Sequence, residues 1–182
     1  MKVITNILIS VLSFAISYGI AHLTGSVIVK NAVLLAYVIH WIAYIPAYLF
    51  QTEKFYDLTG SLTYLSVTWY ALILASGDFA NANVANTVIV LLISLWALRL
   101  GSFLFMRIHK DGEDKRFRTI KPSATQFFMT WTLQGLWVSL CSMCALTAIS
   151  SDSGVVVNAL FYFGLGLFLL GFSTEIVADN QK

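Results

Sequence analysis

The chain has 182 residues, of which 58% are hydrophobic and only 11% are charged, with a formal net charge of +2. This composition and a mean hydropathy of +0.79 are typical of integral membrane proteins. They exclude a soluble nucleic-acid-binding module, which needs a basic face, and two cysteines give no disulfide framework. We therefore expect a lipid bilayer to surround most of the chain.

Six apolar runs approach or exceed the roughly 20 residues that a membrane-spanning helix needs. They lie at 4–23, 27–50, 59–76, 84–108, 126–149 and 155–177. The connections between them are short, so consecutive helices should be antiparallel neighbours. The sequence predicts an all-α, polytopic transmembrane bundle of about six helices, forming a single membrane domain over residues 1–182.

The distribution of Lys and Arg predicts the orientation of this bundle. Lys2, Lys54 and the basic residues of 107–121 would share one side of the membrane, whereas Lys30 would lie on the other. The positive-inside rule then places both termini in the cytoplasm. The first run continues past Tyr18 without a small-residue cleavage motif, so we expect a retained helix rather than a signal peptide.

A polar stretch follows the second run directly, and it contains Glu53 and Asp57. Pro46 lies just before it and removes one backbone hydrogen bond from the helix. Two interpretations stay open: these polar groups line a cavity beside the proline, or they form a solvated turn between two helices.

The fourth run contains Arg99 within an apolar segment and ends at Arg107. Eight residues separate the two side chains, which is about 12 Å along a helix and about 80° around it. A cation at membrane depth indicates a functional site, although a snorkelling structural arginine is the alternative. Gly101, between them, allows a backbone or ligand to approach closely.

The loop 110–121 combines acidic and basic residues, including Asp114 and Arg116. Mixed signs argue against a simple lipid-headgroup patch, which would be uniformly basic. The loop is either a solvated positive-inside loop or part of a site beneath Arg99.

The sixth run carries Gly171, Glu175 and Asp179 at intervals of four, so that they share one helix face. Glu175 and Asp179 would lie on the same side of the membrane as Arg99 and are its candidate anionic partners. The alternative is that the helix simply leaves the bilayer there. Close helix packing is the expected reason for the glycines of this run.

Neither the cysteines nor the histidines predict chemistry. Cys141 and Cys144 fall in an apolar helix without basic neighbours, so we expect small buried apolar side chains. None of the three histidines has a partner at metal-ligand spacing, and we assign no metal.

Two motifs resemble a known family. The first runs through Trp96, Arg99, Leu100, Gly101, Leu104, Arg107, Gly112, Asp114, Arg116 and Phe117, and the second through Gly171, Glu175, Ala178, Asp179, Gln181 and Lys182. With the helix pattern, they resemble the bacterial, DUF1295-type branch of the steroid 5-alpha-reductase-like membrane family. The resemblance implies a bacterial inner-membrane protein. Characterised members use NADPH to reduce a carbon–carbon double bond conjugated to a ketone in a lipid such as a steroid.

The resemblance also implies roles for individual residues. Arg99, Arg107 and Arg116 would hold the phosphates of the cofactor, because Arg binds phosphate oxygens bidentately. Asp179 is similar to an acidic residue that contacts the cofactor, and Asp114 and Glu175 complete the expected cofactor-binding set.

In the reductases an acid and a tyrosine act on the ketone oxygen. Glu53 or Asp57 is the candidate acid in this sequence, whereas Trp96 stands where the reductases have the tyrosine.

Family members continue into further membrane segments with an Arg-His-Pro-Asn-Tyr-x-x-Glu motif, and this sequence has no His-Pro dipeptide. We expect a truncated product, a chain that needs a second chain to complete the cofactor pocket, or a catalytically silent protein. Three functions stay open: an NADPH-dependent reductase of lipid enones, a non-catalytic protein that binds lipid or pairs with other helices, and a methyltransferase of the isoprenylcysteine type.

Overall fold

The computed structural model describes residues 2–77 and 82–181. Within them lie α1 (Lys2–Leu23), α2 (Val27–Leu49), α3 (Tyr56–Ser76), α4 (Val84–Asp111), the 3-10 turn η1 (Lys115–Arg118), α5 (Ala124–Ile149) and α6 (Ala159–Asn180). Each of the six α-helices is long and apolar enough to cross a membrane. The prediction of an all-α, polytopic transmembrane bundle is confirmed, and the chain is an integral membrane protein.

Local capping sets the ends of these helices. Asn158 adopts an extended conformation and accepts a hydrogen bond from the Phe161 amide at 3.0 Å, so α6 begins four residues later than the apolar run that starts at 155. Ser123 caps α5 in the same way. Serine and threonine hydroxyls inside the helices bond to carbonyls four residues earlier, as Thr63 does to Thr59 at 2.7 Å. Such bonds allow polar side chains within an apolar bundle.

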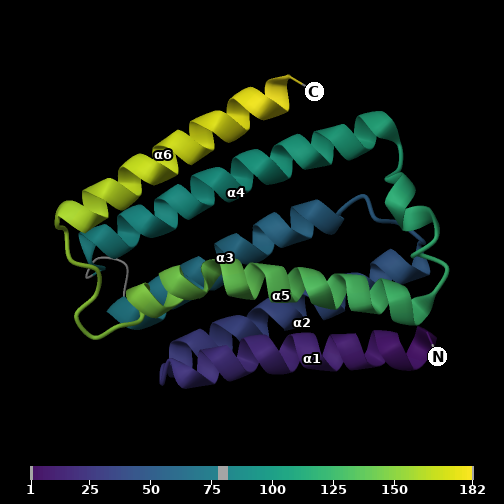
Figure 1. The fold of residues 1–182 in the computed structure, drawn as a ribbon, viewed down its shortest axis with the longest axis horizontal. Coiled ribbons are helices and arrows are strands. Elements are labelled where there is room, and N and C mark those ends of the chain that lie inside the picture. The colour runs from purple at the N-terminus through teal and green to yellow at the C-terminus, as the bar shows by residue number, and fades with distance from the viewer. Residues whose placement is uncertain (1, 78–81, 182) are drawn as a thin grey trace.

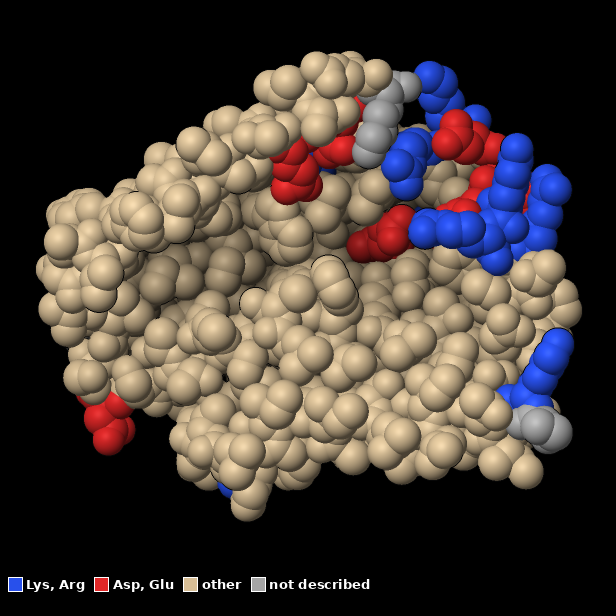
Figure 2. Space-filling view, viewed as in Figure 1, with Lys and Arg blue, Asp and Glu red and all other residues tan. Residues whose placement is uncertain are grey.

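The helices form an inner group and a separate edge. α3 packs against α2, α4 and α5, and α5 packs against α1, α2 and α3. Figure 1 shows α4 and α6 side by side along one edge of the molecule, with α1 and α2 along the opposite edge. The amino terminus and the α2–α3 and α4–α5 connections lie at one end, where Lys and Arg gather (Figures 1 and 2). Which side of the membrane this end faces stays a prediction.

Close helix crossings in the inner group depend on glycines. A Cβ added at Gly101 of α4 would lie 2.7 Å from the Cβ of Ser61 on α3, which is closer than real carbon atoms approach. A Cβ at Gly135 of α5 would lie 3.2 Å from the Tyr37 ring on α2. The expected close approach at Gly101 is therefore present, and the partner is a helix.

α6 differs, because none of its described residues is buried. An added Cβ would meet nothing within 4 Å at Gly164, Gly166 or Gly171, so our expectation of close packing at these glycines was wrong within the described chain. The expectation for Cys141 and Cys144 was also wrong, since both side chains are exposed on α5. The composition of an apolar helix therefore does not predict which of its faces is exposed on the surface of the bundle.

Candidate functional site

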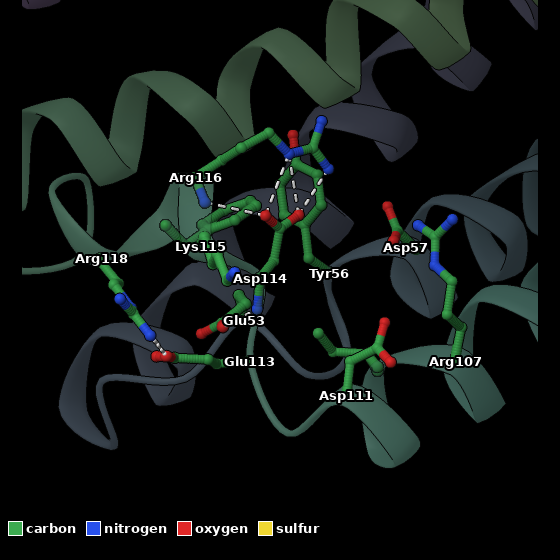
Figure 3. A pocket seen from close by; sticks show the side chains of 12 residues that line it. Glu53, Tyr56, Asp57, Arg107, Asp111, Glu113, Asp114, Lys115, Arg116 and Arg118 are labelled. Carbon is green, nitrogen blue, oxygen red and sulfur yellow. Dashed lines mark hydrogen bonds and ion pairs between the residues drawn. The ribbon is translucent and has the colours of Figure 1, made fainter.

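A cleft with a volume of about 790 Å³ opens at the charged end of the bundle, between the start of α3, the end of α4 and η1 (Figure 3). We call it the α4–α5 cleft, after the connection between these two helices, which closes it. Its lining consists of Glu53, Tyr56, Asp57, Arg107, Ile108, Asp111, Glu113, Asp114, Lys115, Arg116, Phe117 and Arg118. Five of the predicted site residues are therefore brought together: Glu53, Asp57, Arg107, Asp114 and Arg116.

The loop that closes this cleft is specified by three features of its sequence. Gly112 ends α4 with φ 83°, a backbone conformation that glycine adopts without strain. Asp114 then caps η1, accepting a hydrogen bond from the Arg116 amide at 2.9 Å. Phe117 is buried against an aromatic cluster that includes Tyr56 and Phe127. The loop is thus held to the bundle by an apolar anchor.

Glu53 is a buried carboxylate that fixes the same loop. One of its oxygens accepts the Asp114 amide at 2.9 Å, and the other pairs with the Lys121 ammonium at 2.5 Å. The residue is only 5% exposed. A buried carboxylate needs hydrogen-bond or ion-pair partners, and the loop supplies one for each oxygen of Glu53. Because both oxygens are engaged, Glu53 is better suited to positioning the loop than to proton transfer.

Two further pairs lie within the loop. Arg116 bonds to the Asp114 carboxylate through Nε at 2.9 and 3.1 Å, and Arg118 bonds to Glu113 through Nε at 2.7 Å. Hydrogen bonds from Arg116 hold the pKa of Asp114 below its usual value, and Asp114 raises the pKa of Arg116. Arg118 lowers the pKa of the exposed Glu113 in the same way.

Arg107 is different, because its guanidinium makes no hydrogen bond or ion pair among the described residues. Its guanidinium carbon lies 6.0 Å from the centre of the Phe103 ring. Figure 3 shows the Asp57 carboxylate and the Arg107 guanidinium directed toward each other at the mouth of the cleft. Both groups line the cleft and form no hydrogen bond or ion pair with each other.

The other three predicted site residues, Arg99, Glu175 and Asp179, form a separate group between α4 and α6. Together with Trp96 of α4, we call this group the α4–α6 cluster. Arg99 Nη1 bonds to Glu175 Oε1 at 2.8 Å, and Arg99 Nη2 pairs with Asp179. Trp96 Nε1 donates to Glu175 Oε2 at 2.9 Å. The pairing of Arg99 with Glu175, which spacing alone left open, is present.

Phe103 links the two groups. The guanidinium carbon of Arg99 lies 5.8 Å from the centre of its ring, and that of Arg107 lies 6.0 Å away. Both cations can therefore interact with the same π-system. The predicted site residues form two neighbouring sites on one face of α4, and not a single site.

A family model described as "Protein of unknown function (DUF1295)" matches residues 43–182, which is more than half of the chain. The chain belongs to this family. No curated protein and no solved structure matches it. The DUF1295 match covers both sites and names no reaction, so the cofactor and residue roles stay predictions.

Several residues of the DUF1295 chain's two sites were not predicted from the sequence as site residues: Tyr56, Asp111, Lys115 and Lys121. Trp96 was named only by resemblance, and its hydrogen bond to Glu175 was not predicted, although Trp96 precedes Arg99 by about one turn and so shares its face. Lys121 had no visible signal, since its partner Glu53 is 68 residues away in sequence. The pairing depends on how the loop folds back over α3.

Proposed function

We propose that this protein is a membrane enzyme that binds NADPH in the α4–α5 cleft and reduces the carbon–carbon double bond of a lipid enone. The observation that carries the proposal is Arg107, a guanidinium without an ion-pair partner at the mouth of a large polar cleft. Cleft volumes of roughly 300–1,000 Å³ are usual for ligand sites, and this cleft falls within that range.

The residues present fit a sugar-phosphate ligand. Arg107 and Lys115 line the cleft without an ion pair among the described residues, and both can bind phosphate oxygens. Asp57 and Asp111 also line it without a hydrogen bond of the side chain, and carboxylates accept hydrogen bonds from ribose hydroxyls in dinucleotide sites. Arg107 is preferred over Arg99 because two carboxylates already occupy the guanidinium of Arg99.

NADPH, when bound, supplies the hydride that adds to the β-carbon of the enone. A proton must then reach the α-carbon, and a hydrogen-bond donor must stabilise the charge that develops on the carbonyl oxygen. Asp57 is the better candidate for the proton, because its carboxyl group is not engaged as that of Glu53 is. A second chain that encloses the cofactor is compatible with the open mouth of the cleft.

The first test is a fluorescence titration of NADPH against the purified chain in lipid nanodiscs. We expect saturable binding that Arg107→Gln weakens about tenfold or more, because a charge-assisted contact is lost. Lys110→Gln is the matched control. It removes one positive charge from the same end of α4, and Lys110 does not line the cleft.

Equal weakening in both variants would mean that the cleft attracts NADPH only through overall charge. No saturable binding by the folded chain would contradict the proposal and favour a non-catalytic lipid-binding protein. Competition of S-adenosylmethionine with the titrated ligand would instead favour a methyltransferase. Consumption of NADPH upon addition of a long-chain enone tests the reduction itself.

A further inference from the structure

Two polar side chains meet in the core of the bundle, where α2, α3 and α5 pack against one another. His40 of α2 and Trp131 of α5 are both 0% exposed, and the centres of their rings lie 6.3 Å apart. His40 Nε2 and Trp131 Nε1 have no hydrogen-bond partner among the described residues. A buried polar atom without a partner is costly, so each nitrogen requires a group that can bond to it.

The two nitrogen atoms have complementary requirements. His40 Nδ1 lies 2.7 Å from the Ala36 carbonyl and donates to it, so Nε2 of the neutral ring is an acceptor. The indole N–H of Trp131 can only donate. A group that bridges the two must therefore accept one hydrogen bond and donate another.

The size of this bridging group follows from the spacing of the rings. Two polar atoms that a single water molecule connects are about 5–6 Å apart, because each hydrogen bond is about 2.7–3.0 Å long. The ring centres of His40 and Trp131 are 6.3 Å apart, which is compatible with such a bridge. A water molecule needs only about 10–15 Å³ of accessible volume, so it requires no large cavity.

A third polar atom lies on the same face of α5. Gln134 follows Trp131 by three residues, which makes their side chains neighbours on the helix. Gln134 Nε2 donates to the Tyr56 carbonyl at 3.0 Å, whereas its Oε1 has no partner within the described chain. One donor and two acceptors match the lone pairs and the two hydrogen atoms of a single water molecule.

The His40–Trp131 pair lies next to the α4–α5 cleft, with one aromatic ring between them. The Trp131 ring packs edge-on against the Tyr56 ring with centres 5.0 Å apart, and Tyr56 lines the cleft (Figure 3). Movement of the Tyr56 ring would therefore give water a path from the cleft to the pair. This path does not cross the hydrocarbon of the membrane.

We infer that one water molecule is bound between His40 and Trp131, where it accepts a hydrogen bond from the indole and donates one to the imidazole. Its second hydrogen atom is available to Gln134 Oε1. The water joins α2 to α5 and satisfies polar atoms that no described side chain reaches. Buried waters of this kind make about three hydrogen bonds and are costly to remove. The inference uses neither the cofactor nor the substrate of the proposed function.

Radiolytic footprinting tests for this water, because hydroxyl radicals that form from a bound water oxidise the side chains in contact with it. The chain in nanodiscs receives a short X-ray pulse, and oxidation is mapped by mass spectrometry. Tyr37 is the control, because it is also 0% exposed but its hydroxyl bonds to Ser17 Oγ and to the Ser13 carbonyl, both at 2.8 Å. We expect His40 and Trp131 to be oxidised about tenfold faster than Tyr37.

Two tryptophans near His40 provide matched variants. Trp131→Phe removes the N–H that holds the water, and we expect the oxidation of His40 to fall about tenfold. Trp41→Phe removes an indole N–H that already donates to Thr132 Oγ1 at 3.1 Å, and the oxidation of His40 should be unchanged. Tyr37 should stay protected in both variants, which reports that the core is folded.

A reciprocal variant tests the other end of the bridge. His40→Leu removes the acceptor and keeps an apolar side chain of similar size, so the oxidation of Trp131 should also fall about tenfold. This variant leaves the large Trp131 side chain in place, and it therefore tests the bridge without a change in the main aromatic contacts of α5.

Protection of His40 and Trp131 equal to that of Tyr37 would overturn the inference, because no water would then lie at the pair. Continued oxidation of His40 in Trp131→Phe, or an equal fall in Trp41→Phe, would also overturn it, since the water would then not depend on the Trp131 N–H. None of these results involves NADPH, so failure of this inference and failure of the proposed function are distinguishable.

Discussion

The inner helices and α6 are similarly apolar but are held in place by different forces. α3 and α4 interlock where Gly101 meets Ser61, so their relative position is set by backbone approach and van der Waals contact. α6 buries no described residue and reaches α4 through the Arg99 ion pairs and the Trp96 hydrogen bond. Apolar sequence places a helix in the membrane, and small or charged residues determine which neighbour it contacts.

The difference matters for function because both sites use α4. Its packed face gives a rigid reference through α3, while Arg99, Phe103 and Arg107 follow one another in successive turns of another face. A ligand site beside a weakly packed helix can admit a lipid, whereas a site anchored to the inner helices keeps its geometry. We therefore expect variants in the inner helices to lower the stability of the bundle, and variants in the α4–α6 cluster to change the position of α6.

Gly101→Val should have the largest effect on stability. The new side chain would collide with Ser61, and overpacking of this kind costs about 1–3 kcal/mol. Reversible unfolding in mixed micelles, followed by circular dichroism, measures the loss. Gly166→Val, where the added atoms meet open space, is the control. If Ser61→Gly does not partly rescue Gly101→Val, the helices are not held by this contact.

Arg99→Met should act on α6 and leave the inner helices intact. It leaves Glu175 and Asp179 without their cation, and after allowance for their partial exposure we expect a cost of about 1–3 kcal/mol. Spin labels at the exposed positions Leu98 and Val177 report the α4–α6 distance by pulsed electron resonance. The distribution of this distance should broaden in Arg99→Met. It should narrow again in the triple variant Arg99→Met/Glu175→Gln/Asp179→Asn. An unchanged distribution in Arg99→Met would show that apolar contacts alone place α6.

Glu53→Gln should loosen the loop over the α4–α5 cleft while both helix groups stay in place. It breaks a buried pair with Lys121, and we expect a local cost of about 1–2 kcal/mol. Hydrogen exchange of 112–121 should accelerate, most clearly at the Asp114 amide that bonds to Glu53. Glu113→Gln breaks only an exposed pair with Arg118 and should leave the exchange unchanged. Equal acceleration in both variants would contradict the assigned role of Glu53.

Acid should have the smallest effect, confined to the same loop. The pKa of Asp114 is below its usual value in the folded chain, so its contribution to stability is complete above the unfolded pKa of about 4 and is lost as pH falls through the folded pKa. Because the Arg116 partner is exposed, the loss should stay below about 1 kcal/mol. Hydrogen exchange of the loop between pH 5 and 3 measures it, and Asp114→Asn should remove this part of the pH dependence.

Sequence predicted the helices well because hydropathy acts over about 20 residues at a time. It also suggested that Arg99 and Glu175 meet, since a cation at membrane depth requires a nearby anion. It did not predict the division into two sites, because relative rotation of helices is not encoded in spacing. The outward position of Cys141 and the Glu53–Lys121 pair were missed for related reasons, since both depend on tertiary packing.

The central claim is that Arg107 holds the cofactor while Arg99 holds α6. NADPH titration of Arg107→Gln beside the triple variant Arg99→Met/Glu175→Gln/Asp179→Asn tests it most directly. We predict that Arg107→Gln loses most of the binding and that the triple variant, whose cluster is neutral, retains it. Full binding by Arg107→Gln, with loss in the triple variant, would contradict the account and return the phosphate-binding role to Arg99.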